Sequence, residues 1–312
     1  MGLIIINKKY YYILYYMYKN IEGFKEFYNK KEKEEKKECN NIPKVLKIKD
    51  PEKINFKKCN KIIPQPPACV IICSPIKTGK TTLLSNLLLN PNFYGKDYFD
   101  EVIIISNTIC NDITGRFLLK SFTCHNIYSD KLVIDLLKRQ DKDGEENEEG
   151  KKEHRKDVAL IFDDILGSIK RESVANYIST RFRHYNIKLL IYSTQTARGI
   201  SSMVRQNCTD FIMGSPFPNQ KEKEKIFEEY GDLFGGYKNL EKIYKIATPN
   251  RYDFLYLSMQ DNPPKAYRNF ETLIATGEKI ENNNNTLINV NEDKCGCHSD
   301  DYSDIISDTD SD

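Results

Sequence analysis

The sequence lacks the features that mark several specialised protein classes. It has no secretory signal, and its 9 cysteines are scattered, so we expect a reducing compartment rather than a disulfide framework. Its apolar stretches near the N-terminus are interrupted by Lys8 and Lys9 and are too short to span a bilayer. No internal repeat is visible, and the hydrophobic (39%) and charged (29%) fractions are ordinary for a globular domain. The sequence therefore predicts a globular protein without a stable transmembrane anchor.

The chain has little net charge, +2 over 312 residues, but its charges are unevenly spread. Residues 1–62 hold 16 Lys and 8 Asp or Glu (16 − 8 = +8), and residues 291–312 hold 1 Lys and 8 Asp or Glu (1 − 8 = −7). A basic head favours contact with a polyanion, and an acidic tail is typical of solvated disorder. We predict a basic low-complexity extension at 1–62, a folded domain at 63–278, and a disordered tail at 279–312 that is Asn-rich and then acidic.

In the central region, short apolar runs alternate with segments of helical character. Continuous apolar runs fit strands that are covered on both faces, and their alternation with helices predicts an α/β domain with a mainly parallel sheet. We expect strands at 68–73, 101–106, 158–162, 187–193 and 210–213, with a late edge strand at 252–258. We expect helices at 81–89, 130–140, 171–184 and 219–230, and a charged surface loop at 141–157.

The strongest chemical signal is the segment SPIKTGKT at 74–81, which lies between an expected strand and an expected helix. It matches the phosphate-binding pattern GxxxxGK[ST], known as Walker A, except that Ser74 replaces the first glycine. In this pattern the loop amides and the helix N-terminus face the phosphates of a nucleotide. Lys80 would contact the β- and γ-phosphates, and the Thr81 hydroxyl would ligate Mg²⁺. The predicted nucleotide contacts are Ser74, Pro75, Ile76, Lys77, Thr78, Gly79, Lys80, Thr81 and Thr82.

The second signal is the apolar strand VALIF at 158–162, which ends in Asp163 and Asp164. An acid at the end of a buried strand downstream of a phosphate-binding loop is the Walker B pattern. Asp163 would hold Mg²⁺ through water, and Asp164 would act as the general base that polarises the attacking water. A kinase transfers phosphate to a bound acceptor and does not need this second acid, so the pair favours a hydrolase.

The third signal is Gln195, which follows the next expected strand in the run Ser193-Thr194-Gln195. A glutamine at this place can reach the γ-phosphate and the attacking water. The alternative is a polar residue that only ends a strand.

A group of arginines forms the fourth element: Arg181, Arg183, Arg198 and Arg205. Ring motors often insert an arginine from one subunit into the site of its neighbour, where it stabilises transition-state charge. Arg183 and Arg205 are our candidates for this role. The sequence does not choose among the four, and the alternative that weighs more for any single one is a surface residue or a DNA contact.

Together these segments resemble one family. Arg183-His184-Tyr185-Asn186, the strand ending in STQ, and Met203-Val204-Arg205-Gln206-Asn207-Cys208 with Asp210 are similar to the DNA-packaging ATPases of nucleocytoplasmic large DNA viruses, the poxvirus-type branch of the FtsK–HerA superfamily. The resemblance runs from about residue 68 to about residue 213. It implies a three-layer P-loop NTPase with a RecA-like sheet, in which an additional strand lies between the Walker A and Walker B strands.

The resemblance also implies an activity and its partners. A homo-oligomeric ring, usually a hexamer, would hydrolyse ATP with Mg²⁺ and thread double-stranded viral DNA into a capsid, with capsid or portal proteins as partners. The location would be the host cytoplasm, in a viral factory, and the virion. Three alternatives stay open: a related DNA helicase or segregation pump, a P-loop kinase of a nucleotide or metabolite, and an assembly protein without turnover, which Ser74 favours.

Overall fold

The computed structural model describes residues 59–142, 155–165, 167, 169–217, 219–277, 279–281 and 287–289. They belong to the compact unit Phe56–Asp312. Most of the predicted extension at 1–62, of the charged loop at 141–157 and of the tail at 279–312 lies outside the described residues.

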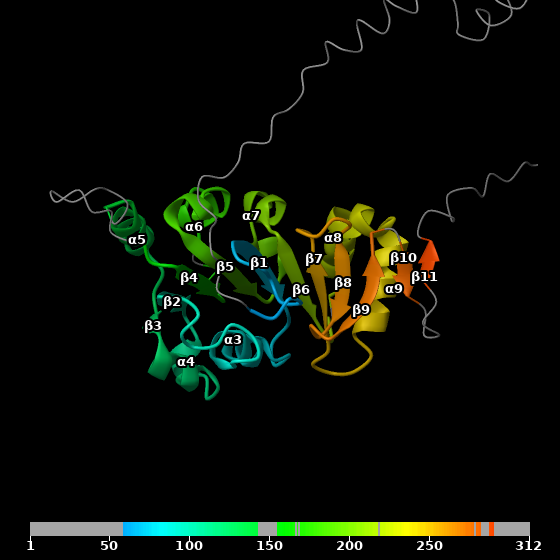
Figure 1. Ribbon diagram of the computed structural model, residues 1–312, viewed down its shortest axis with the longest axis horizontal. Coiled ribbons are helices and arrows are strands. Elements are labelled where there is room, and N and C mark those ends of the chain that lie inside the picture. Colours follow the sequence, from blue (N-terminus) through cyan, green and yellow to red (C-terminus); the bar gives the residue numbers. More distant parts are fainter. Residues whose placement is uncertain are drawn as a thin grey trace, which may run out of the picture. The chain divides into compact units, whose positions relative to one another are not determined.

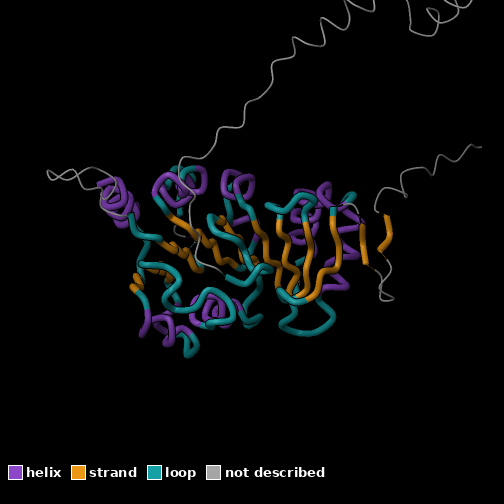
Figure 2. The backbone as a smooth tube through the Cα atoms, in the orientation of Figure 1, coloured by secondary structure: helices purple, strands orange, loops and turns teal. Residues whose placement is uncertain are grey.

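A single 11-stranded sheet forms the centre of this unit, in the order β11-β10-β9-β8-β7-β6-β1-β5-β4-β2-β3 (Figures 1 and 2). Every neighbouring pair from β6 to β3 in this order is parallel. The parallel strands are β1 (Ala68–Cys73), β2 (Glu101–Ser106), β3 (Thr123–His125), β4 (Val158–Asp163), β5 (Ile187–Thr194) and β6 (Asp210–Gly214).

The order of the parallel strands confirms the predicted fold class. β5 lies between β1, the Walker A strand, and β4, the Walker B strand, with which it pairs on either side. The additional strand of a RecA-like sheet therefore stands at its expected place. Because parallel strands end at the same edge, this order brings the ends of β1, β4 and β5 together.

The other half of the sheet is antiparallel and was mostly not predicted. It consists of β7 (Phe254–Ser258), β8 (Lys265–Arg268), β9 (Thr272–Thr276), β10 (Lys279–Glu281) and β11 (Leu287–Asn289). The strand expected at 252–258 is confirmed as β7, but its expected place at the edge was wrong, because β7 pairs with β6 on one side and β8 on the other. The sheet also continues past residue 278, where the sequence suggested the end of the domain.

Helices cover both faces of the sheet, which gives three layers (Figure 1). Within β1, Val70 and Ile72 pack with α3 and α4 on one face, whereas Ile71 and Cys73 pack with the helices of the opposite face. Alternate residues of a strand point to opposite faces, so a strand covered on both sides is apolar throughout. The first face carries α3 (Lys80–Leu89) and α4 (Gly115–Ser121), and the second carries α5 (Asp130–Lys142), α6 (Val174–Tyr177), α7 (Ser202–Asn207), α8 (Gln220–Tyr230) and α9 (Tyr237–Ala247).

The helix expected at 171–184 is instead three short segments: α6, η3 (Ile178–Thr180) and η4 (Phe182–Tyr185). Two hydroxyls bond back to backbone carbonyls, Ser179 Oγ to Asn176 O at 2.7 Å and Thr180 Oγ1 to Tyr177 O at 2.9 Å. Arg181 then leaves the helical region with φ −131° and ψ 0°. Such side-chain bonds compete with the helical pattern, which accounts for the interruption.

The remaining short helices are η1 (Ile109–Asn111), η5 (Ala197–Gly199) and η6 (Gly231–Phe234). The sequence did not predict β3, α4 or α9. In the part of the chain that is described, no helix combines the length and the apolar character needed to cross a membrane.

Candidate functional site

Residues 74–79 join β1 to α3, and their main chain is left-handed at two places. Lys77 has a φ of 61° and Gly79 a φ of 90°. Gly79 immediately precedes α3, and its carbonyl accepts a hydrogen bond from Leu83 N at 2.8 Å. Left-handed residues of this kind turn successive amides toward one side, which makes an anion-binding concavity at the helix N-terminus. The conformation at 79 also explains why this position is glycine.

Ser74, the departure from the Walker A pattern, braces the base of this loop. Its side chain is buried, its Oγ shares a hydrogen bond with Thr78 Oγ1, and Thr78 Oγ1 donates to Pro75 O at 2.5 Å. Gly214 at the end of β6 provides the room, since a Cβ there would lie 1.8 Å from Ser74 Oγ. The serine thus substitutes for the first glycine of the pattern because the neighbouring strand has no side chain at that place.

The ends of β1, β4 and β5 bring Lys80, Asp164 and Gln195 together. Lys80 Nζ donates to Asp164 Oδ1 at 2.9 Å, and Gln195 Nε2 donates to Asp164 Oδ2 at 3.3 Å. Asp164 is left-handed, with φ 50°, and its amide donates to Ser193 O at 2.9 Å. Strained backbone of this kind is enriched at functional sites. The main chain therefore turns sharply after β4 and fixes the carboxylate between a cation and an amide.

Asp163, one residue earlier, is buried at 4% exposure. Ser106 Oγ at the end of β2 donates to its Oδ2 at 2.9 Å, whereas Oδ1 is buried without a hydrogen-bond partner among the described residues. Burial raises the pKa of Asp163 and the charge of Asp164 raises it further, whereas the hydroxyls of Ser193 and Ser106 and the charge of Lys80 oppose this rise. A buried oxygen without a donor calls for another partner, such as a cation or water.

A cavity of about 830 Å³ opens in front of these residues. Pro75, Ile76 and Lys77 of the loop, Asp164 and Gln195 line it. The segment between η1 and α4 adds another wall. The remaining lining residues are Gly79, Lys80, Thr81, Thr82, Thr108, Asn111, Asp112, Ile113, Thr114, Arg251 and Tyr252.

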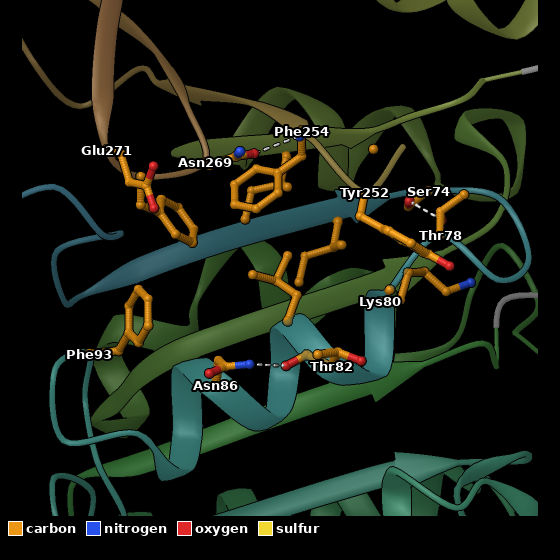
Figure 3. Close-up of a pocket in the computed structure, with 16 residues that line it drawn as sticks. Ser74, Thr78, Lys80, Thr82, Asn86, Phe93, Tyr252, Phe254, Asn269 and Glu271 are labelled. Atoms are coloured by element: carbon orange, nitrogen blue, oxygen red, sulfur yellow. Dashed lines mark hydrogen bonds between the residues drawn. The ribbon is translucent and has the colours of Figure 1, made fainter. Parts of the chain in front are cut away.

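A second cavity of about 530 Å³ runs along α3 and shares Gly79, Lys80, Thr82 and Tyr252 with the first. Figure 3 shows Tyr252 near Lys80, with Glu271 and Phe93 at the other end, past Asn86. Three phenylalanines line it, and their rings form one group: Phe270 lies 6.1 Å from Phe93 and 5.0 Å from Phe254, centroid to centroid. Its walls also include the aliphatic residues Ile72, Leu83 and Ile212 and the polar residues Asn86, Asn269 and Glu271, so this cavity combines aromatic and polar surface.

The two candidate arginines do not reach either cavity of their own chain. Arg183 is exposed, its guanidinium carbon lies 5.5 Å from the Phe182 ring centroid, and it precedes β5, at the strand end opposite Gln195. Arg205 Nε lies 2.6 Å from Glu229 Oε2, and its side chain is 10% exposed. A role for either residue in a neighbouring subunit stays a prediction, and the ion pair of Arg205 counts against that residue.

Sequence reasoning missed Ser106, Gly214 and Arg251, as well as Tyr252 and the three phenylalanines of the second cavity. Ser106 ends an expected strand next to the Walker B strand, and this position was a signal that could have been used. Gly214 and Arg251 carried no local signal, because their relation to the loop depends on strand pairing and on the turn between α9 and β7.

No family profile matches the chain, and no curated protein matches it in sequence. Among solved structures, it is similar to the genome packaging NTPase B204 from Sulfolobus turreted icosahedral virus 2 in complex with sulfate, at 16% identity, 64% of this chain, 95% of that chain and a TM-score of 0.44. It is also similar to B204, the DNA-packaging ATPase from Sulfolobus turreted icosahedral virus, at 17% identity over 65% of this chain and 98% of that chain, with a TM-score of 0.45. EssC (ATPases 2 and 3) from Geobacillus thermodenitrificans is similar at 13% identity over 51% of this chain and 34% of that chain, with a TM-score of 0.38. The similarity concerns the fold alone.

Proposed function

We propose that this chain is a Mg²⁺-dependent ATP hydrolase that translocates double-stranded DNA during packaging of a viral genome. The observation that supports ATP hydrolysis is the hydrogen-bonded group of Lys80, Asp164 and Gln195 beside the Walker A loop. The cation, the acid and the amide that hydrolysis needs line the same cavity as the loop. The DNA and packaging parts rest on the family resemblance in the sequence.

The two cavities suggest how a nucleotide lies. The larger one contains the loop and the charged residues, which suits the β- and γ-phosphates. The smaller one combines three phenylalanines and aliphatic residues with the polar residues Asn86, Asn269 and Glu271, which suits a nucleobase. Thr82 and Tyr252 line both, so the ribose and α-phosphate would lie beside them.

The residues present fit a magnesium ion. Asp163 Oδ1 is a buried carboxylate oxygen without a hydrogen-bond partner among the described residues, and Thr81 lines the larger cavity. Asp163, through water, and the Thr81 hydroxyl would hold the ion together with the phosphates. When bound, Mg²⁺ neutralises charge on the β- and γ-phosphates.

The ion pair between Lys80 and Asp164 is the resting arrangement of the reactive groups. A triphosphate offers Lys80 a stronger anionic partner, which frees Asp164 Oδ1 to accept a proton from water, while Gln195 keeps Oδ2 in place. The water oxygen bonds to the γ-phosphorus, and the bond from the γ-phosphorus to the β–γ bridging oxygen breaks. ADP and phosphate leave, and the proton passes from Asp164 to solvent.

The hydrogen bond between Ser74 and Thr78 argues against an assembly protein without turnover. That alternative relied on Ser74 as a departure from the Walker A pattern, but the serine fits the loop without blocking the cavity. The kinase alternative requires an acceptor in place of water and leaves the position of Asp164 between Lys80 and Gln195 unexplained. On the basis of the family resemblance, we also propose a homo-oligomeric ring, capsid or portal proteins as partners, and a viral factory in the cytoplasm as the location.

Steady-state ATP hydrolysis with and without linear double-stranded DNA tests the proposal. We expect DNA to stimulate turnover, added salt to remove the stimulation, and Lys80→Ala and Asp164→Asn each to lower turnover by at least about 10²-fold. Lys138→Ala and Asp135→Asn on the exposed face of α5 are matched controls. Turnover that ignores DNA would contradict the motor, and turnover retained in Asp164→Asn would contradict the assigned base.

A further inference from the structure

The turn between α9 and β7 is rigidly held, although it presents two exposed side chains. Asp253 is buried and accepts hydrogen bonds from Asn250 N at 3.0 Å, Arg268 Nη2 at 3.0 Å and Asn269 Nδ2 at 2.7 Å. These bonds tie the turn to itself and to the β8–β9 connection. Residues 251 and 252, between the fixed ends, are therefore held in place without being buried.

Tyr252 at the tip of this turn is left-handed, with φ 77°, and 57% exposed. A bulky residue rarely adopts this conformation, and such strain persists where the surroundings hold it and is enriched at ligand sites. The ring lies over the phosphate-binding loop: its Cδ1 is 3.7 Å from the position of a Cβ on Gly79 (Figure 3). Tyr252 also lines both cavities, together with Gly79, Lys80 and Thr82.

Arg251 lines the cavity that contains Asp164 and Gln195, and it does not line the aromatic one. Its guanidinium carbon lies 5.0 Å from the centroid of the Tyr252 ring, so the two side chains stack. Among the described residues, none forms an ion pair with Arg251, whereas Lys80 in the same cavity is paired with Asp164. Arg251 is thus a cation with free donors at the end of the site where phosphate charge is greatest.

We propose that Arg251 binds the β- and γ-phosphates of the nucleotide held by its own chain, and that Tyr252 positions it by stacking. This inference rests on the proposed nucleotide site and adds to it a second cation in cis, independent of any arginine from a neighbouring subunit. A guanidinium matches phosphate oxygens with two parallel donors, which an ammonium group cannot do. Arg251→Lys should therefore recover only part of the function lost in Arg251→Ala.

Calorimetric titration with AMPPCP plus Mg²⁺ and with AMP separates the two ends of the nucleotide. In Arg251→Ala we expect AMPPCP affinity to fall by about 10- to 100-fold and AMP affinity to stay within about twofold, because AMP lacks both phosphates. Arg171→Ala, an exposed arginine outside both cavities, is the matched control. Unchanged AMPPCP binding, or an equal loss for both ligands, would overturn the inference. A wild type that binds neither ligand would instead overturn the proposed function.

Mixing variants tests whether Arg251 acts within its own chain. Lys80→Ala subunits retain Arg251, so they would supply it to Arg251→Ala subunits if the contact were made across an interface. For a contact in cis, equal mixtures should hydrolyse ATP no faster than the two variants measured separately. Turnover restored by mixing would refute the contact in cis. Thermal unfolding of Arg251→Ala should match the wild type, since the side chain is exposed.

Discussion

Replacing Gly214 with alanine tests whether β6 leaves room for the serine in the phosphate-binding loop. The new Cβ would lie 1.8 Å from Ser74 Oγ and 2.7 Å from Ser74 Cβ, so the loop or the strand must move. Ser74 is 3% exposed and cannot turn toward solvent. We expect Gly214→Ala to lower the free energy of unfolding by about 1–3 kcal/mol from overpacking, with about 1 kcal/mol more if the bond to Thr78 is lost.

The double variant Ser74→Gly/Gly214→Ala makes this reasoning specific. Without the serine side chain, the nearest remaining atom to the new Cβ is Cα of residue 74 at 3.5 Å, an ordinary contact. We expect Ser74→Gly to offset the Gly214→Ala loss, with an interaction free energy of about 1–3 kcal/mol in a double-mutant cycle. Urea unfolding followed by circular dichroism measures the four free energies, and AMPPCP binding shows whether the loop still holds phosphate. Gly167→Ala, with no atom within 4 Å of its Cβ, is the control. If Gly214→Ala leaves the free energy of unfolding unchanged, or if the two substitutions have additive effects, Gly214 does not provide the room for Ser74.

Three further predictions concern other parts of the site and its sheet. Tyr252→Gly should raise the free energy of unfolding by about 1 kcal/mol, because glycine relieves the strain of the left-handed backbone. The same substitution should weaken AMPPCP binding, and unchanged binding would show that the ring has no role in holding the ligand. Gln195→Ala should lower kcat by about 10²-fold with AMPPCP affinity within about twofold, and Gln220→Ala on the exposed start of α8 is its control. Burial raises the pKa of Asp210 above its unfolded value, so the folded state binds more protons than the unfolded state. The wild type should therefore gain stability relative to Asp210→Asn as pH falls from 7 to about 4. Urea unfolding across this range measures the difference in stability, and a difference that does not change with pH would contradict the raised pKa.

The elements that were predicted correctly are those whose local pattern leaves one solution. β1 and β2 were placed at their observed bounds, because both faces of these strands are covered and the sequence is apolar without interruption. The loop at 74–79 lies between a strand and a helix as predicted, because the Walker A pattern requires Gly79 and Lys80 in fixed order between these two elements. The order of β1, β5 and β4 came from the family resemblance, since nothing local in those strands specifies which one lies between the others.

What was missed depends on contacts between distant segments. β8 and β9 are short and partly polar, KAYR and TLIAT, and their strand conformation depends on pairing that begins at β7. The helix expected at 171–184 had the right composition, but Ser179 and Thr180 bond to the backbone and Arg181 departs from helical geometry. Arg251 lies in a turn without a recognisable motif, and only the fold brings it to the cavity that Asp164 and Gln195 line.

The antiparallel half of the sheet explains why the Walker motifs alone do not describe this site. Ser74 contacts Gly214 of β6, and Gly214 is in register with Phe254 of β7, so the base of the phosphate loop is joined directly to the wall of the aromatic cavity. Asp253 then binds both the turn that carries Tyr252 and the β8–β9 connection beside Phe270. In the proposed arrangement the parallel strands supply the groups for phosphate chemistry, whereas the segments around the antiparallel strands line the cavity assigned to the base and carry Arg251. The proposed nucleotide contacts therefore include residues that no phosphate-binding motif contains.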